Sequence, residues 1–299
     1  MWKPMLLMLL PAVLLASESA SAAPLRILYL TKSEGFEHGP VHQQDGQPSH
    51  SDKWLTQIAE SIGATIVCTK DASEVNAEAL KNYDVVIFYT QGDLRNMGDK
   101  DQGRVMGENG VTELLDWVKA GGGFIAIHAG TDSFRSGKDG EPTPYTQMVG
   151  GEFRGHGPQF KGTLKVVDAS HPIMSGQPAE WTVMEEWYLH RNFNTASLHV
   201  LATLDPGPAG RRIKDYDLPE IPMVWCSAYG SGRVFVNAMG HREDVWDHEN
   251  FRNTLVNGIQ WVGGAGEAMA APNFAQAISD ELDPATGARK ADGPAAEGK

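Results

Sequence analysis

The 299-residue chain carries 38 acidic and 25 basic side chains, a net charge of −13, and 41% hydrophobic residues. These proportions are typical of a folded globular protein and exclude a chain that is disordered throughout. The acidic balance argues against nucleic acid and anionic membranes as partners, whereas a neutral small molecule such as a sugar is compatible with it.

Residues 1–23 have the pattern of a secretory signal peptide. Lys3 supplies a positive start, the stretch 5–16 is apolar apart from one proline, and residues 20–22 give a small-residue cleavage pattern. The apolar stretch is too short to span a bilayer. We therefore expect a mature chain that begins near residue 24 and is periplasmic or secreted.

The two cysteines leave two alternatives open. In an oxidising compartment Cys68 and Cys226 can form a single disulfide. Each cysteine also lies in an apolar run, which favours a buried free thiol.

Strands and helices alternate in the first half of the chain. Short apolar runs indicate buried strands, and apolar residues at helical spacing indicate helices. The expected strands are 26–31, 64–69, 84–90 and 124–128, and the expected helices are 51–62, 76–82 and 111–120. Continuous apolar strands that alternate with helices predict an α/β fold with a parallel sheet and helices on both faces.

The second half of the chain is richer in strands. Strands are expected at 161–168, 183–190 and 198–204, a hairpin-like pair at 222–229 and 233–239, and a last helix at 250–261. We interpret 151–204 as a strand-rich insertion on the same sheet. From 263 to 299 alanine, glycine, proline and charged residues dominate, which predicts a largely disordered tail with a short helix near 274–282.

Reactive side chains follow several of the predicted strands. Ligands of parallel α/β sheets bind at the carboxyl ends of the strands. The side chains expected at this edge are Glu34, His38, Gln91, Asp93, His128, Thr131, Asp132, His241 and Glu243. Histidine recurs among them, and its ordinary titration lies closest to neutral pH, so this edge is the predicted place of proton transfer.

The stretch 121–132 is the most informative. It runs from three glycines through a buried strand into a tight turn, which lifts one side chain above the sheet as a nucleophile elbow does. The lifted side chain is His128. A lone histidine there is more often satisfied by the backbone, but the clustering of reactive groups favours a functional role. The pattern from His241 to Glu243 likewise places an imidazole and a carboxylate at one strand end.

Five motifs in order resemble the trehalose-utilisation ThuA-like family: residues 31–38, 121–132, 148–153, 185–188 and 232–241. The resemblance covers about residues 25–262 and implies one domain over 24–262, with a flavodoxin-like sheet related to class I glutamine amidotransferases. In that larger group a cysteine stands where this chain has His128, and a His-x-Glu matches His241 and Glu243. Without a thiol at that position, covalent glutaminase chemistry is not expected.

The resemblance also implies sugar utilisation, with trehalose-like disaccharides or their keto derivatives as substrates. A keto-sugar has an acidic α-hydrogen, so a histidine base can abstract it while a second acid releases the glycosidic partner, which is lyase or hydrolase chemistry. We assign His128 and His241 as base and acid, in either order, and Glu243 as the group that orients His241.

Side chains suited to sugar hydroxyls and sugar faces lie near these residues. Glu186 and Tyr188 share one face of the expected strand 183–190, and carboxylates beside aromatic rings are typical of sugar sites. The candidate substrate-binding residues are His38, Asp132, Arg154, His156, Glu186 and Tyr188.

Two alternative functions remain open. One is a sugar-binding protein without turnover on an amidotransferase-like scaffold. The other is a metal-dependent hydrolase, in which His38, His42 and His50 join His128 or His241 around a divalent metal. No cysteine pair and no His-Glu-x-x-His helix accompanies them, so the sequence predicts no certain cofactor.

Overall fold

The computed structural model describes residues 23–98, 101, 103–137, 140–266 and 271–290. The predicted signal peptide therefore lies almost wholly outside the described residues, as do the last nine positions of the chain. No helix within the described ranges is both long and apolar enough to cross a membrane.

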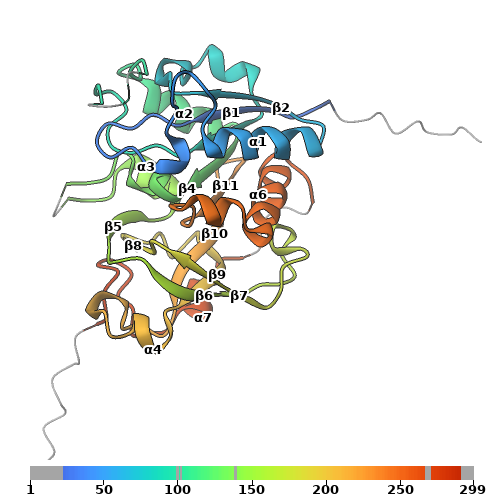
Figure 1. The fold of residues 1–299 in the computed structure, drawn as a ribbon. Coiled ribbons are helices and arrows are strands. Elements are labelled where there is room, and N and C mark those ends of the chain that lie inside the picture. Colours follow the sequence, from blue (N-terminus) through green and yellow to red (C-terminus); the bar gives the residue numbers. More distant parts are fainter. Residues whose placement is uncertain (1–22, 99–100, 102, 138–139, 267–270, 291–299) are drawn as a thin grey trace, which may run out of the picture.

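A nine-stranded sheet forms the centre of the molecule, and a two-stranded ribbon stands beside it (Figure 1). The strands are β1 (Arg26–Leu30), β2 (Thr65–Thr69), β3 (Val85–Phe88), β4 (Gly123–Ile127), β5 (Glu152–His156), β6 (Phe160–Val166), β7 (Glu180–Glu185), β8 (Tyr188–Arg191), β9 (His199–Asp205), β10 (Ile221–Tyr229) and β11 (Gly232–Asn237). The helices are α1 (His50–Ser61), α2 (Gly110–Lys119), α3 (Pro144–Val149), α4 (Gly207–Gly210), α5 (Glu243–Trp246), α6 (Glu249–Val262) and α7 (Phe274–Ala277).

The parallel half of the sheet has the flavodoxin-like order β2-β1-β3-β4-β11, with β11 in the fifth position. Helices α1 and α6 pack together on one face, and α2 and α3 pack together on the other (Figure 1). Cover on both faces explains why β3 and β4 are continuous buried apolar runs. The predicted α/β fold is confirmed.

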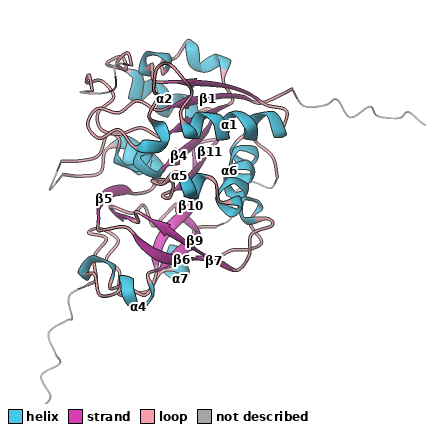
Figure 2. Cartoon of the chain, viewed as in Figure 1, coloured by secondary structure: helices cyan, strands magenta, loops and turns pink. Residues whose placement is uncertain are grey.

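The strand-rich insertion of the second half is also present, and most of it extends the same sheet. Strands β10, β9, β6 and β7 continue the sheet beyond β11, each antiparallel to its neighbour. Strands β5 and β8 form the separate ribbon. Figure 2 shows this strand-rich part below the helix-covered half of the sheet.

One predicted strand is in fact two. The stretch 183–190 divides into β7, which ends at Glu185, and β8, which begins at Tyr188, and the two strands belong to different sheets. The indole of Trp187 is buried in the break and donates a hydrogen bond to the Phe160 carbonyl at 2.9 Å. Apolar residues continue through the break, so the sequence pattern does not reveal it.

Smaller differences concern helices. Helix α1 begins at His50, one residue earlier than expected, and Ser49 and Asp52 form a capping box at its start. The short helix expected at 76–82 is a 3₁₀ turn over Ala79–Asn82.

The tail expected to be largely disordered is packed over residues 271–290. Phe274, Ile278 and Leu282 are buried, and α7 lies where a short helix was expected. The Asn273 amide pairs with both backbone groups of Val200, at 2.6 and 3.0 Å, on an edge of β9 that β6 does not reach. Composition misled here because a few apolar residues and one amide suffice to anchor the segment.

The two cysteines do not form a disulfide. Cys226 is buried in β10 and Cys68 lies in β2, with β1, β3, β4 and β11 between the two strands. Both are free thiols, and burial raises the pKa of Cys68 to about 12.

Candidate functional site

His128 lies on a tight turn directly after β4, as the sequence predicts. Its φ of +44° is in the left-handed region that residues other than glycine rarely adopt. A Cβ on Gly130 would lie 2.6 Å from the Phe88 carbonyl oxygen, so this turn requires glycine there. The turn places the imidazole between the ends of β3 and β11, with Nδ1 3.0 Å from the Ala238 carbonyl oxygen.

Four side chains from separate segments meet at this edge of the sheet. His38, His128, Glu186 and His241 each offer one nitrogen or oxygen, and these four atoms lie within 4.8 Å of one another. They come from the loop after β1, the turn after β4, the break between β7 and β8, and the turn after β11. All except His241 are buried. We call these four residues the His/Glu cluster.

The Glu186 carboxylate contacts three imidazoles. Its Oε2 lies 2.9 Å from His241 Nδ1 and 3.7 Å from His128 Nε2, and its Oε1 lies 3.3 Å from His156 Nδ1. Burial favours the neutral carboxyl, but the His128 and His241 rings outweigh it and hold the pKa of Glu186 well below its ordinary range. Glu186 is therefore an anion at neutral pH.

The neighbours of His128 define its tautomer. A carbonyl oxygen only accepts, so Nδ1 must carry the proton that it donates to Ala238. Nε2 then presents a lone pair toward Glu186, and this buried nitrogen has no hydrogen-bond partner among the described residues. Burial lowers the pKa of His128 to about 4, so the ring is neutral at pH 7. Two acceptors thus face each other.

Tyr188 contacts two members of the cluster, His38 and His128. Its hydroxyl lies 3.0 Å from His38 Nε2, and its ring lies 3.7 Å from the His128 ring. Burial lowers the pKa of His38 well below its ordinary value, and the His128 and His241 rings add to the effect. The His156 ring stacks on the Tyr188 ring, with ring centres 5.9 Å apart.

Glu185 holds two backbone segments of the cluster in place, a role that the sequence pattern does not reveal. Its buried carboxyl accepts backbone N–H groups from Gly240 at 2.7 Å, from His241 at 3.2 Å and from Glu186 at 2.6 Å. Burial raises the pKa of Glu185 to about 8 against the opposing effect of these three donors. One side chain thus ties the turn after β11 to the break that carries Glu186.

Glu243 does not orient His241. The chain enters α5 at Glu243, whose side chain is exposed, and Glu186 occupies the position beside the His241 ring. Glu243 instead lines a shallow depression of about 400 Å³ that opens over His241. The His-x-Glu spacing misled because the chain turns outward after Gly240.

Two of the three loop histidines proposed as metal ligands lie elsewhere. His42 contacts Glu37 at 2.7 Å, and His50 contacts Asp247 at 2.9 Å. Of the three, His38 is the one that enters the cluster.

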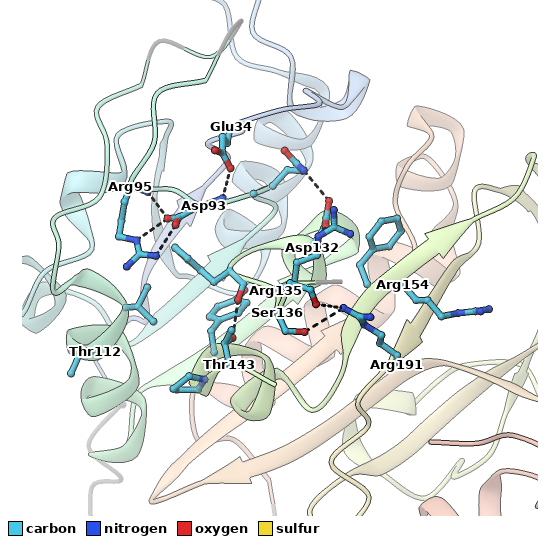
Figure 3. Close-up of a pocket in the computed structure, with 18 of the residues that line it drawn as sticks. Glu34, Asp93, Arg95, Thr112, Asp132, Arg135, Ser136, Thr143, Arg154 and Arg191 are labelled. Carbon is cyan, nitrogen blue, oxygen red and sulfur yellow. Dashed lines mark hydrogen bonds and ion pairs between the residues drawn. The ribbon is translucent and has the colours of Figure 1, made fainter. Parts of the chain in front are cut away.

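A cavity of about 820 Å³, larger than the shallow depression, has Asp132, Arg135 and Arg154 among its lining residues (Figure 3). Asp132 is in its wall, where it accepts a hydrogen bond from Gln91 at 2.9 Å and lies 3.0 Å from Arg135 Nε. Burial raises the pKa of Asp132. Phe153 lines the same cavity and lies 4.3 Å, ring to ring, from Tyr188, so the cavity wall and the cluster are in contact.

The nine predicted site residues therefore divide by place. The His/Glu cluster contains His38, His128, Glu186 and His241; His156 and Tyr188 lie against it; Asp132 and Arg154 line the larger cavity; Glu243 lines the shallow depression.

A further buried histidine supports the turn that carries His128. His190 Nε2 donates to the Thr131 hydroxyl at 3.0 Å, and that hydroxyl donates to the His128 carbonyl at 2.8 Å. His190 Nδ1 is buried without a hydrogen-bond partner among the described residues, and burial lowers the pKa of His190 to about 3.

We expect His190 to make the fold sensitive to acid. The unfolded ring titrates near 6.5, so below that pH the unfolded state binds a proton that the folded state refuses until about pH 3. The free energy of unfolding should fall by about 2 kcal/mol between pH 6.5 and 5 through this ring. Urea unfolding of the protein and of His190→Gln measures the difference, and equal pH slopes in both would contradict it.

Comparison with known proteins identifies one matching family. The sequence model of the ThuA family, described as trehalose utilisation, matches residues 26–262. No curated protein matches the chain.

Similar solved structures include two ThuA-like proteins. The one from Bacteroides uniformis has 20% identity and a TM-score of 0.60, and covers 82% of this chain and 94% of its own. The one from Parabacteroides merdae has 19% identity and a TM-score of 0.60, with 89% and 96% covered. A Salmonella typhimurium protein titled as cytoplasmic has 15% identity and a TM-score of 0.53, with 80% and 99% covered. At these identities the likeness concerns the fold.

Proposed function

The chain belongs to the ThuA family of trehalose utilisation, and we propose that it is an exported lyase that cleaves a keto-glycoside, such as an oxidised disaccharide, at the His/Glu cluster. The observation that carries the proposal is the cluster itself. It gathers buried imidazoles around one carboxylate at the carboxyl ends of parallel strands, where sheets of this kind bind ligands. The signal-peptide pattern of residues 1–23 supports export.

The larger cavity supports a sugar as the substrate. Its volume of about 820 Å³ lies within the range of small-molecule sites and is large enough for a disaccharide. Asp132 and Arg135 offer an acceptor and a donor for hydroxyl groups, and Phe153 offers an aromatic face. Because Phe153 also touches Tyr188, a ring bound there reaches toward the cluster.

Burial changes the roles first assigned to the histidines. The His128 side chain is 0% exposed, so it cannot meet a sugar, and its Nε2 faces the Glu186 carboxylate inside the cluster. His156 is 41% exposed, and its described contacts, with the Gly157 carbonyl and Glu186, both involve Nδ1. Its Nε2 takes part in neither contact, and the ring lies 6.1 Å, centre to centre, from Phe153 in the cavity wall. We therefore assign Nε2 as the proton acceptor and Glu186 as the group that stabilises the imidazolium that forms.

The proposed reaction is an elimination. Nε2 of His156 takes the proton from the carbon between the keto group and the glycosidic carbon. The bond from the glycosidic carbon to the leaving oxygen breaks as the carbon–carbon double bond forms. The imidazolium then returns its proton to the leaving oxygen, so one base serves both steps and no second reactant is consumed.

A mass-spectrometric turnover screen of the purified mature protein tests the proposal. We expect cleavage of 3-keto disaccharides and no cleavage of the parent sugars. His156→Gln should lower kcat by about 10² to 10⁴-fold with little change in KM, because it removes the proton acceptor. His42→Gln, an exposed histidine of the loop that carries His38, is the control and should leave turnover unchanged. Binding of keto-sugars without any product would overturn the proposal in favour of a capture protein.

A further inference from the structure

We infer that the His/Glu cluster binds one divalent transition-metal ion of the zinc type through His38, His128, Glu186 and His241. The inference deepens the proposed function, since it places the ion at the centre where the keto-glycoside reacts. It rests on the geometry of the cluster, which is independent of what the substrate is.

The first observation is a set of unpartnered nitrogens. His38 Nδ1, His128 Nε2 and His241 Nδ1 are buried atoms without a hydrogen-bond partner among the described residues. His241 Nδ1 lies 2.9 Å from Glu186 Oε2, yet outside the angular geometry of a hydrogen bond. Buried polar atoms are nearly always paired, so three such atoms converging on one carboxylate require an explanation. A cation between them supplies it.

The second observation concerns the other ring nitrogen of His128 and of His38, which in each ring contacts an oxygen atom of the protein. His128 Nδ1 donates to the Ala238 carbonyl at 3.0 Å, and His38 Nε2 lies 3.0 Å from the Tyr188 hydroxyl. Histidines that bind metals use the second ring nitrogen in this way, which fixes the ring and aims the other lone pair at the ion.

The charge of the donor set also suits a divalent cation. Metal binding requires neutral imidazoles and an ionised carboxylate. The cluster offers three imidazoles and one carboxylate, which are ligands of these two kinds. The set carries one negative charge, which a divalent ion more than offsets. Three nitrogen donors favour zinc, iron or nickel over calcium and magnesium, which prefer oxygen.

The size of the cluster is close to that of a zinc site. Tetrahedral zinc with bonds of 2.0–2.1 Å has ligand–ligand edges of about 3.4 Å. The four atoms lie within 4.8 Å of one another, so the widest edge closes by about 1.4 Å, which side-chain rotation provides. His241 lines the shallow depression, so the cluster is open to solvent on that side.

A second histidine cluster in the same protein provides a contrast. His199 contacts the Ala271 carbonyl through Nδ1 and Asp168 through Nε2, and His171 Nε2 lies 3.6 Å from Cys226 Sγ. Every nitrogen of His199 is thus paired, which is the arrangement of a structural network. The His/Glu cluster differs in that three of its buried ring nitrogens have no hydrogen-bond partner among the described residues and its side chains converge.

The bound ion would complement the proposed elimination. A Lewis acid at the keto oxygen makes the neighbouring hydrogen more acidic and stabilises the enolate that proton removal creates. His156 remains free to take the proton because it lies outside the four ligands.

Metal binding by the mature protein tests the inference without any substrate. After dialysis against a chelator, titration with Zn²⁺ should show one equivalent bound and a raised Tm, and Co²⁺ should give the visible absorption of a nitrogen-rich site. Glu186→Gln and His241→Gln should weaken binding by at least about 100-fold. Circular dichroism checks that both variants fold, and His42→Gln should bind as the unchanged protein does. The inference would be overturned if the unchanged protein bound no metal, or if both cluster variants bound it as tightly as the unchanged protein does.

Turnover separates the inference from the proposed function. Full activity in excess chelator would refute the metal while the lyase stands. Stoichiometric metal that depends on the cluster, with no keto-sugar cleaved, would support the metal and refute the lyase.

Discussion

Glu186→Gln is expected to lower kcat/KM by about 10³-fold or more while the protein stays folded. The amide has the size of the carboxylate but lacks the charge that meets His241, His128 and His156. Without that anion, the imidazolium that forms at His156 loses its stabilising partner, and the cluster loses its only negative group. Steady-state kinetics on a 3-keto disaccharide measures the loss.

Glu243→Gln is the matched control, because it makes the same change on an exposed side chain two residues after His241. It should lower kcat/KM by less than about tenfold. A larger loss from Glu243→Gln than from Glu186→Gln would restore Glu243 as the partner of His241 and contradict the site described above.

Glu185→Leu is expected to lower the free energy of unfolding by about 4 kcal/mol. Leucine fills similar space but leaves the N–H groups of Gly240, His241 and Glu186 buried without an acceptor. Each unsatisfied buried donor costs about 1–3 kcal/mol. Urea unfolding measures the change, and the turn that carries His241 should loosen with it.

Glu180→Leu provides the comparison for that variant. Glu180 begins the same strand, β7, but its side chain is exposed. The substitution should change stability by no more than about 0.5 kcal/mol. Equal destabilisation by both variants would show that Glu185 does not hold the turn.

Local patterns were sufficient to predict the parallel half of the fold. Its strands are continuous apolar runs separated by helices, and each such run is short enough to be assigned without knowledge of its neighbours. The break between β7 and β8 could not be predicted, because both sides of it continue the same alternation of residues. What ends β7 is the contact of Glu185 with a turn more than fifty residues away.

The sequence likewise predicted only part of the site. His128 and His241 stand at strand ends beside glycines, so their place at the edge followed from the sequence. Glu186 was expected to bind substrate, and its position between the rings depends on the break in the strand. Glu243 was assigned by spacing alone, and spacing does not show that α5 turns it outward.

The packed segment 271–290 shows a similar limit. Its alanines, glycines and prolines are typical of a linker, while the anchoring groups are few and scattered. Phe274 and the Asn273 amide anchor the segment only because β9 has a free edge beside an apolar surface. That edge is a property of the tertiary fold.

The central claim is that His156, supported by Glu186 of the cluster, abstracts a proton beside a keto group, and hydrogen exchange at the substrate carbon tests it most directly. A 3-keto sugar without a leaving group is incubated with the protein in D₂O and followed by NMR. The exposed ring of His156 exchanges its proton with solvent, so deuterium should enter at the carbon beside the keto group. His156→Gln should abolish the exchange. Cleavage of keto-glycosides by a protein that never exchanges this hydrogen would contradict the mechanism.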